Sequence, residues 1–206
     1  MELHPSSKMK PERRNALFAA ATQEFTEYGF EQASLNRIIG EVGMSKSSFY
    51  HYFANKTELF QQIFQQTLAP VAKIVERFEP ESLTKDTFWP AINASTLGSS
   101  EFLLEHPELF NIGRMFHRNL HEPNGVCADM MKMPMDLITR LIERGKEIGT
   151  IRDDLPTSLL LSSAMGLGMA IDRWAIDNSE HFTPDTFVDF QEKVIGMFVS
   201  ILGPVR

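Results

Sequence analysis

Apolar residues recur with the period of an α-helix along nearly the whole chain. The first apolar face is formed by Leu17, Ala20, Ala21, Phe25 and Tyr28. Gly29 then supplies a stop, because glycine readily adopts the backbone conformation that ends a helix. No stretch keeps a strict two-residue alternation long enough to predict a sheet. The pattern therefore predicts an all-α protein with about nine helices.

A second and a third helix follow closely. Ser34 can cap the second helix, whose apolar positions 35, 38, 39 and 42 recur at helical spacing before Gly43. Ser45 is a fresh N-cap, so a turn over 43–45 joins two short helices. Two short helices joined by a glycine-containing turn are typical of a helix-turn-helix unit.

The third helix divides its aromatic residues between two sides. At 100° per residue, one side carries Phe49, Tyr52 and Phe53. The opposite side carries Lys46, Ser47, Tyr50 and His51. We expect the first set to pack inward and the second to be presented to a partner.

Longer helices make up the rest of the chain. Asn55 and Glu58 are spaced as a capping pair for a fourth helix, which Pro70 is expected to kink. Five or so further helices are separated by polar or proline-containing breaks. These breaks are Pro107, residues 122–125, Gly149, Pro156 and Thr183–Pro184.

The last predicted helix, over 183–202, carries two apolar stripes. One stripe is Phe187, Phe190, Val194, Met197 and Ile201, and the other is Val188, Ile195, Val199 and Leu202. Such a helix is either a central core helix or packs one stripe on its own chain and the other on a second subunit. The preceding helix adds small residues that permit close approach. The candidate dimer interface is Ser163, Phe187, Phe190, Val194, Met197 and Ile201.

Composition supports an ordinary folded protein of the cytoplasm. The 206 residues are 43% hydrophobic and 23% charged, and no apolar run approaches the length of a membrane helix. The lone Cys127 fits a reducing compartment and is expected to be a small buried hydrophobe. The net charge of −7 is uneven: seven Lys or Arg against six Glu give residues 1–56 a charge of +1, leaving −8 on the remainder. This asymmetry indicates two parts with different partners.

The helix-turn-helix pattern indicates contact with double-stranded DNA. A recognition helix enters the major groove, and its first residues must be short or basic to approach bases and phosphates. Residues 45–48, Ser-Lys-Ser-Ser, meet that requirement. Tyr50 can hydrogen-bond a phosphate from the presented side, and His51 can reach a phosphate or a base edge.

The segment GFEQASLNRIIGEVGMSKSSFYHYFANKTELF closely resembles the N-terminal DNA-binding domain of the TetR family of bacterial transcriptional repressors. The resemblance is strong over the first 60 or so residues and thins to length and helical character beyond residue 80. It implies recognition-helix contacts at Lys46, Ser47, Ser48, Tyr50 and His51. It further implies backbone clamps at Ser34, Arg37 and Lys56.

The resemblance also implies a domain plan and a mode of action. Residues 1–9 would form a flexible tail, 10–56 the DNA-binding domain, and 57–206 a ligand-binding and dimerisation domain. A homodimer would bind a near-palindromic operator, and a small hydrophobic or amphipathic effector would release it, because an effector that favours another dimer geometry must weaken DNA binding. Repression is the main expectation and activation stays open. No cofactor and no membrane association are expected.

Aromatic and methionine residues in the C-terminal part are candidates for an adaptable apolar pocket. Asn93 and Arg114 could orient a ligand, and Asp172 is a further polar group of this kind. The apolar candidates are Trp89, Phe110, Met115, Met130, Met165, Met169 and Trp174.

Three other functions compete with this interpretation. His117 and His121, at i and i+4, could start a metal site and make the protein a metal-responsive regulator. A helical interaction module would explain the helices but not the polar side of the third one. An enzyme is disfavoured because the chain has no GxSxG, HExxH, P-loop or GxGxxG motif.

Overall fold

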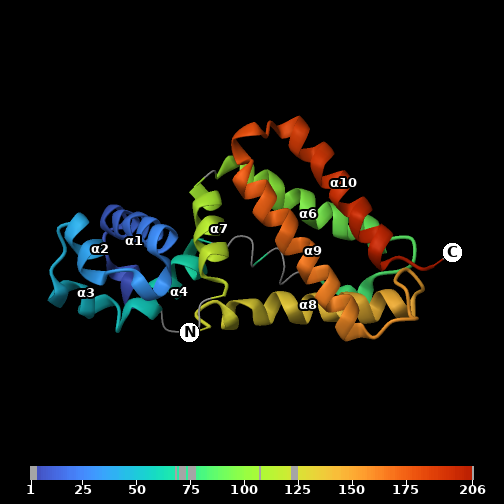
Figure 1. The fold of residues 1–206 in the computed structure, drawn as a ribbon, viewed down its shortest axis with the longest axis horizontal. Helices are drawn as coiled ribbons and strands as arrows, with labels where there is room; N and C mark the ends of the chain where they lie inside the picture. Colours follow the sequence, from blue (N-terminus) through green and yellow to red (C-terminus); the bar gives the residue numbers. More distant parts are fainter. Residues whose placement is uncertain are drawn as a thin grey trace. The chain divides into compact units, whose positions relative to one another are not determined.

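The computed structural model describes residues 4–67, 69, 73, 78–106, 108–121 and 125–205, and in these ranges the regular structure is helical (Figure 1). The all-α prediction is therefore confirmed. The α-helices are α1 Pro11–Gln32, α2 Leu35–Glu41, α3 Lys46–Tyr52, α4 Lys56–Thr67, α6 Phe88–Glu105, α7 Glu108–Asn119, α8 Ala128–Glu147, α9 Thr157–Asp177 and α10 Pro184–Leu202. Short 3₁₀ helices are η1 Pro5–Lys8, η2 Pro80–Ser82 and η3 Ser179–His181. The predicted breaks at Pro70, Pro107 and 122–124 lie outside the described residues.

The chain divides into two compact units. The first unit contains Met1–Ala69 and Asn111–Asp129, and the second contains Pro70–Phe110 and Met130–Arg206. Helix α7 therefore begins in the second unit and ends in the first. These units are defined by packing, and the expected functional boundary between residues 56 and 57 stays a prediction.

Aromatic side chains form the core of the first unit. Phe25, Phe49 and Phe60 are fully buried, and the ring of Phe25 meets that of Phe60 edge-on at 5.0 Å. Both predicted caps are present, because Ser34 accepts the Arg37 amide at 3.4 Å and Ser45 accepts the Ser48 amide at 3.1 Å. Local capping and a shared aromatic core thus fix α2 and α3 against α1 and α4.

The N-terminal segment departs from the expected flexible tail. Residues 5–8 form η1, and the side chain of Ser6 is fully buried. His4 contacts Glu58 of α4 at 3.0 Å, and Gln66 donates a hydrogen bond to the Ser6 hydroxyl at 3.0 Å. These long-range contacts cannot be read from local spacing, because their partners are more than fifty residues apart.

Helix α1 is kinked near its end. Gly29 has φ 74° and ψ 163°, which lies outside the helical region, and the chain then makes one more turn to Gln32. A side chain at this φ would be strained, so glycine is required at the kink. The predicted stop at Gly29 is therefore a kink with a short continuation.

The second unit is built around α6, α8, α9 and α10. Its buried core includes Phe88, Ile142, Leu160 and Leu202, and helix α10 packs along α6. Thr183 caps α10 by accepting the Thr186 amide at 3.3 Å. One side of α9 and one side of α10 pack into this core, and other apolar residues of both helices remain exposed.

The two predicted stripes on α10 do not each keep to one environment. Phe187 and Val194 are buried within their own chain, which corrects their assignment to the dimer interface. Met197 and Ile201 from the same stripe are exposed, while Phe190 is half-buried. The buried positions 187, 194 and 202 recur nearly two turns apart, so the inward face cuts across both predicted stripes.

Helix α9 is long and apolar enough to cross a membrane by length and composition alone. This departs from the expectation that no such helix is present. A core or interface helix of a soluble protein meets the same test, so the observation is weak evidence for a membrane span. Its exposed apolar residues include Leu159 and Trp174.

Candidate nucleic-acid interface

Helix α3 presents one polar side and buries one aromatic side. Lys46, Ser47 and His51 are exposed, and Tyr50 keeps 55% of its surface accessible. Phe49 and Phe53 are buried and stack on each other at 5.3 Å, which confirms their predicted core role. The buried rings therefore pack α3 onto the interior of the first unit, while its first turn and its outer side face solvent. Tyr52 is half-buried.

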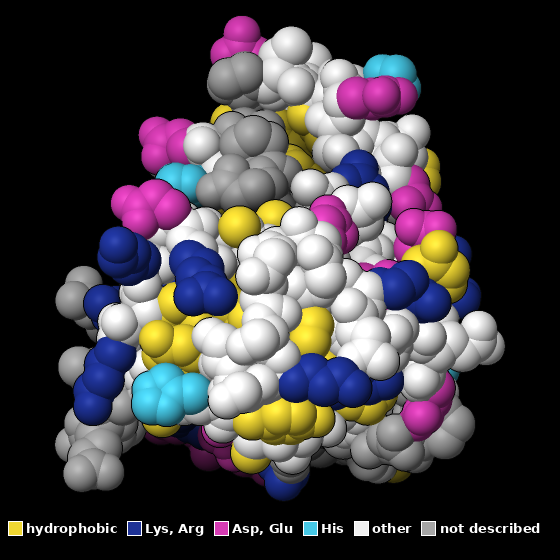
Figure 2. All heavy atoms as spheres, turned by 90° about the vertical axis from the view of Figure 1, so that its left-hand side faces the viewer, with side chains coloured by type: hydrophobic (Ala, Val, Ile, Leu, Met, Phe, Trp, Pro, Cys, Tyr) yellow, Lys and Arg dark blue, Asp and Glu magenta, His cyan; other side chains and the backbone are white. Residues whose placement is uncertain are grey.

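Figure 2 shows the side of the first unit that carries α1, α2 and α3. Lys and Arg side chains are spread over this face, with hydrophobic side chains visible between them and Asp and Glu side chains also present. Such a surface is suited to an extended polyanion, because cations contact phosphates while apolar groups contact sugars and base methyls.

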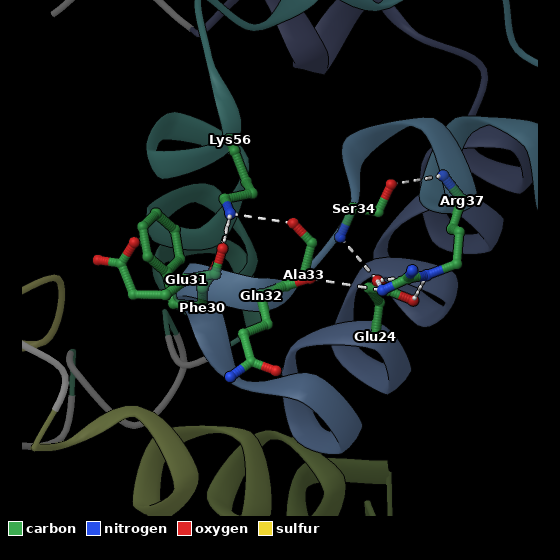
Figure 3. Close-up of polar contacts among 8 residues, drawn as sticks. All are labelled: Glu24, Phe30, Glu31, Gln32, Ala33, Ser34, Arg37 and Lys56. Atoms are coloured by element: carbon green, nitrogen blue, oxygen red, sulfur yellow. Dashed lines mark hydrogen bonds and ion pairs between the residues drawn. The ribbon is translucent and has the colours of Figure 1, made fainter.

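The guanidinium of Arg37 is hydrogen-bonded to residues of the first unit. Its Nε donates to both carboxylate oxygens of Glu24, at 2.8 and 3.0 Å, and its Nη2 donates to Oε1 at 2.5 Å (Figure 3). The guanidinium also lies over the Tyr28 ring, 4.4 Å from the centroid. Glu24 further accepts the Ser34 amide at 2.7 Å, so a single carboxylate joins α1 to the start of α2.

Opposing effects act on the pKa of Glu24. Burial alone would raise it, but the hydrogen bonds from Arg37 and from the Ser34 amide outweigh burial and hold the pKa of Glu24 below its ordinary value. The carboxylate is therefore ionised at neutral pH and keeps its pairing with Arg37. This state stabilises the α1–α2 corner.

Lys56 is likewise engaged inside the first unit. Its Nζ donates to the carbonyl oxygens of Phe30, Glu31 and Ala33 at 2.5, 3.2 and 3.0 Å (Figure 3). It also lies 4.6 Å from the centroid of the Phe30 ring. A lysine in this place satisfies carbonyls left unpaired at a helix C-terminus and complements the helix dipole. The first residue of α4 thus holds the last turn of α1.

The sequence did not indicate Glu24 as part of this site. Glu24 and Arg37 are thirteen positions apart, and no local helical spacing links them. A weak signal was present, because an acidic residue within the predicted apolar face of the first helix needs a partner when buried.

The predicted pocket candidates divide between the two units. Arg114 and Met115 belong to the first unit, whereas the others belong to the second. Met115 is fully buried, and Trp174 is 53% exposed and stacks on Phe190 at 5.4 Å. Six further candidates are partly buried or buried, namely Trp89, Asn93, Phe110, Met130, Met165 and Met169.

An open cavity of about 530 Å³ lies elsewhere, in the first unit. It is lined by residues of α1 together with Glu41 and Val42, and none of the predicted pocket residues lines it. This cavity therefore gives no support to the predicted effector pocket.

The histidine pair does not have the geometry expected of a metal site. Helix α7 ends at Asn119, so His121 lies beyond it and the two imidazoles do not share one helical face. Across the ranges that the structure describes, no group of three or more His, Cys, Asp or Glu side chains is placed to hold a metal. Cys127 is buried, as predicted.

Comparison with known proteins decides the family. Residues 17–63 match the family described as bacterial regulatory proteins, tetR family. The repressor AcnR of Corynebacterium diphtheriae is 24% identical over 148 residues, which cover 72% of this chain and 73% of that protein. The chain belongs to the TetR family of transcriptional regulators. This is a family of regulators and not of enzymes.

Solved structures of TetR-family regulators share the fold. A putative TetR-family regulator from Shewanella sp. PV-4 superposes with a TM-score of 0.67 at 19% identity, covering 94% of this chain and 99% of that one. FadR from Bacillus subtilis, solved in complex with stearoyl-CoA, superposes with a TM-score of 0.64 at 15% identity, covering 90% and 97%. At these identities the likeness establishes the TetR fold alone.

Proposed function

We propose that this TetR-family regulator is a cytoplasmic repressor that binds a near-palindromic operator as a homodimer and is released by a small effector. Residues 10–56 would read the DNA, and residues 57–206 would dimerise and take up the effector. The curated relative AcnR is named a repressor, which favours repression over activation for this chain.

The division of α3 into two sides is the observation that carries the proposal. Phe49 and Phe53 anchor the helix from below, so its outer side is held rigidly. Lys46, Ser47, Ser48, Tyr50 and His51 are then the residues that contact DNA, by phosphate bonds and by base edges. An interaction module would have no need for short polar residues in the first turn of this helix.

Arg37 and Lys56 act differently in this proposal. Both cations are occupied by contacts within the first unit, as is the amide of Ser34. We assign them to holding the helix-turn-helix in shape in place of the DNA clamping that the family resemblance implied. The Ser34 hydroxyl serves as a helix cap.

Exposed apolar residues on α9 and α10 support a homodimer. Met197 and Ile201 are exposed on one side of α10, Val188 and Val199 are exposed on another, and Leu159 and Trp174 are exposed on α9. A face of this kind is costly in water and is covered when two copies associate about a two-fold axis. The revised interface keeps Met197, Ile201, Phe190 and Ser163.

A charge on that face tests the dimer. Replacing Met197 and Ile201 together by Arg should convert the dimer to a monomer, because like charges would be buried opposite one another. Light scattering coupled to size-exclusion chromatography measures the mass directly. Val205→Arg, at an exposed position beyond α10, is the matched control and should leave the mass unchanged.

Two buried side-chain oxygens support a polar feature in the effector. Among the residues that the structure describes, Oδ1 of Asn93 on α6 and Oε1 of Gln191 on α10 meet no hydrogen-bond donor. A buried acceptor of this kind is costly unless a donor satisfies it. An effector with an apolar body and an N–H or O–H donor would suit them. The related FadR binds stearoyl-CoA, an amphipathic molecule.

Selection of duplexes from a random DNA pool, at two salt concentrations, tests the function. The wild type should enrich a palindrome, and binding should weaken as salt rises because phosphate contacts release counterions. Lys46→Ala/Tyr50→Ala should lose the enrichment while remaining folded. No enrichment and no salt dependence from folded wild type would reject DNA binding and favour the interaction module.

A further inference from the structure

The amide side chain of Asn119, the last residue of α7, is buried in the first unit. Only 1% of Asn119 is exposed, and both polar atoms of its side-chain amide have hydrogen-bond partners. Its Nδ2 donates to the carbonyl oxygens of Phe25 at 3.2 Å and Met115 at 2.6 Å, and its Oδ1 accepts the amide N–H of Phe30. One side chain from α7 thus bonds to α1 on both sides of Gly29.

These bonds fall where α1 needs an external partner. A ψ of 163° at Gly29 turns the following peptide plane out of the regular helical ladder. The amide of Phe30 therefore cannot rely on the helix itself, and it is deep in the protein, where water does not reach it. Asn119 supplies the acceptor, so the kink is stable only while α7 is docked.

Helix α4 also contacts the last turn of α1, which follows Gly29. The carbonyl oxygen of Phe30 accepts Lys56 Nζ at 2.5 Å, while its amide is held by Asn119. The backbone carbonyl and the backbone amide of Phe30 are thus hydrogen-bonded to side chains from two different helices, α4 and α7. The direction in which α1 leaves its kink is set by α7 and α4 together.

That direction matters for reading DNA. Ala33 and Ser34 follow directly, and Ser34 is the N-cap of α2, which in turn packs on α3. An angular error at the kink therefore passes to α2 and then to the recognition helix. Two recognition helices in a dimer must match successive major grooves about 34–36 Å apart, so small errors weaken operator binding.

We propose that Asn119 is a positioning residue for operator recognition: by clamping the Gly29 kink of α1, it makes the shape of the helix-turn-helix depend on α7. This proposal rests on the proposed function. Residues 108–110 of α7 belong to the second unit and residues 111–119 to the first, so this helix is continuous in sequence with both units. Displacement of α7 would release the Phe30 amide and loosen the DNA-reading helices.

The test compares two side-chain truncations seven residues, or about two turns, apart on α7, with the operator selected above. Asn119→Ala removes the three hydrogen bonds of the side-chain amide, whereas Ile112→Ala removes a buried apolar side chain that makes no hydrogen bond. Both are measured where circular dichroism shows them folded. Asn111→Ala, an exposed amide on α7, controls for general effects of truncation.

Asn119→Ala should weaken operator binding at least about tenfold with the salt slope of the wild type, since no phosphate contact is lost. Ile112→Ala and Asn111→Ala should stay within about twofold of the wild type. Hydrogen exchange should accelerate over residues 30–37 in Asn119→Ala alone. Asn119→Ser, which keeps a hydroxyl group for hydrogen bonding, should weaken operator binding less than Asn119→Ala does. If Asn119→Ala does not fold, the serine variant tests the positioning role in its place.

The outcomes separate this proposal from the proposed function. A wild type that selects an operator, together with an Asn119→Ala variant that binds it equally, overturns the positioning role and leaves the repressor intact. Equal weakening by Ile112→Ala also overturns it, because loss of stability would then explain the effect. A folded wild type that selects no duplex overturns both.

Discussion

The basic residue of α3, Lys46, and the basic residues of the neighbouring helices, Arg37 of α2 and Lys56 of α4, differ in their environments. Lys46 is exposed at the first position of α3, whereas Arg37 and Lys56 are bound to groups of α1. All three stand in a segment that resembles a DNA-binding domain, and their residue types alone assign them the same role. The comparison teaches that a basic residue near DNA can contact it directly or can hold the scaffold that does.

The first prediction tests the exposed side of this comparison and has the largest expected effect. Lys46→Ala/Tyr50→Ala should weaken operator binding about 100-fold, at roughly tenfold for each lost contact. The slope of log K against log salt should fall by about one or more, because a phosphate contact is lost. Fluorescence anisotropy over a salt series measures both, and an unchanged slope would remove Lys46 from the phosphate contacts.

The second prediction tests Lys56 as a structural cation. Lys56→Met should lower the free energy of unfolding by about 1–3 kcal/mol, since charge-assisted hydrogen bonds to three carbonyl oxygens are lost. Operator binding should weaken by less than about tenfold with an unchanged salt slope. Lys193→Met, the same change at an exposed position of α10, should do neither. A slope reduced by about one would show that Lys56 contacts phosphate instead.

The third prediction concerns the Glu24 carboxylate. Glu24→Gln keeps the size of the side chain and an acceptor for the Ser34 amide but removes the charge that pairs with Arg37. The free energy of unfolding at pH 7 should fall by about 1–2 kcal/mol, a range discounted for the exposed guanidinium. Urea denaturation measures this loss, and Glu12→Gln on the exposed side of α1 is the matched control.

Acid should abolish the advantage of the wild type over Glu24→Gln. The pKa of Glu24 lies below its ordinary value of 4.5 in the folded state, so its stabilisation is present above 4.5 and is lost as pH falls through the folded pKa. The difference between the two proteins should therefore be constant near neutral pH and shrink below about 4.5. A difference that grows on acidification would contradict the pairing with Arg37.

The smallest expected effect is that of the ring beneath Arg37. Tyr28→Leu should lower the free energy of unfolding by less than Glu24→Gln does, because its cation–π contact with Arg37 lies at an exposed site. A double-mutant cycle with Arg37→Leu isolates the pairwise contribution. Additive losses would mean that the guanidinium is held by Glu24 alone.

The sequence by itself determined the local features of this protein. Helical periodicity gave the all-α class, Ser34 and Ser45 gave the starts of α2 and α3, and the 100° spacing of Phe49 and Tyr50 gave their buried and exposed sides. These features depend on neighbours within about one turn, which the chain places next to each other regardless of the rest of the fold.

Tertiary structure alone decided which polar groups meet. Lys56 meets Phe30 across 26 positions and Asn119 meets the same residue across 89, so neither pairing leaves a local signature. Burial of Phe187 and exposure of Met197 likewise depend on how α10 is rotated against α6, although both belong to one sequence stripe. Hydrogen bonds and packing form between surfaces in space, whereas sequence spacing specifies only which residues share a helical face.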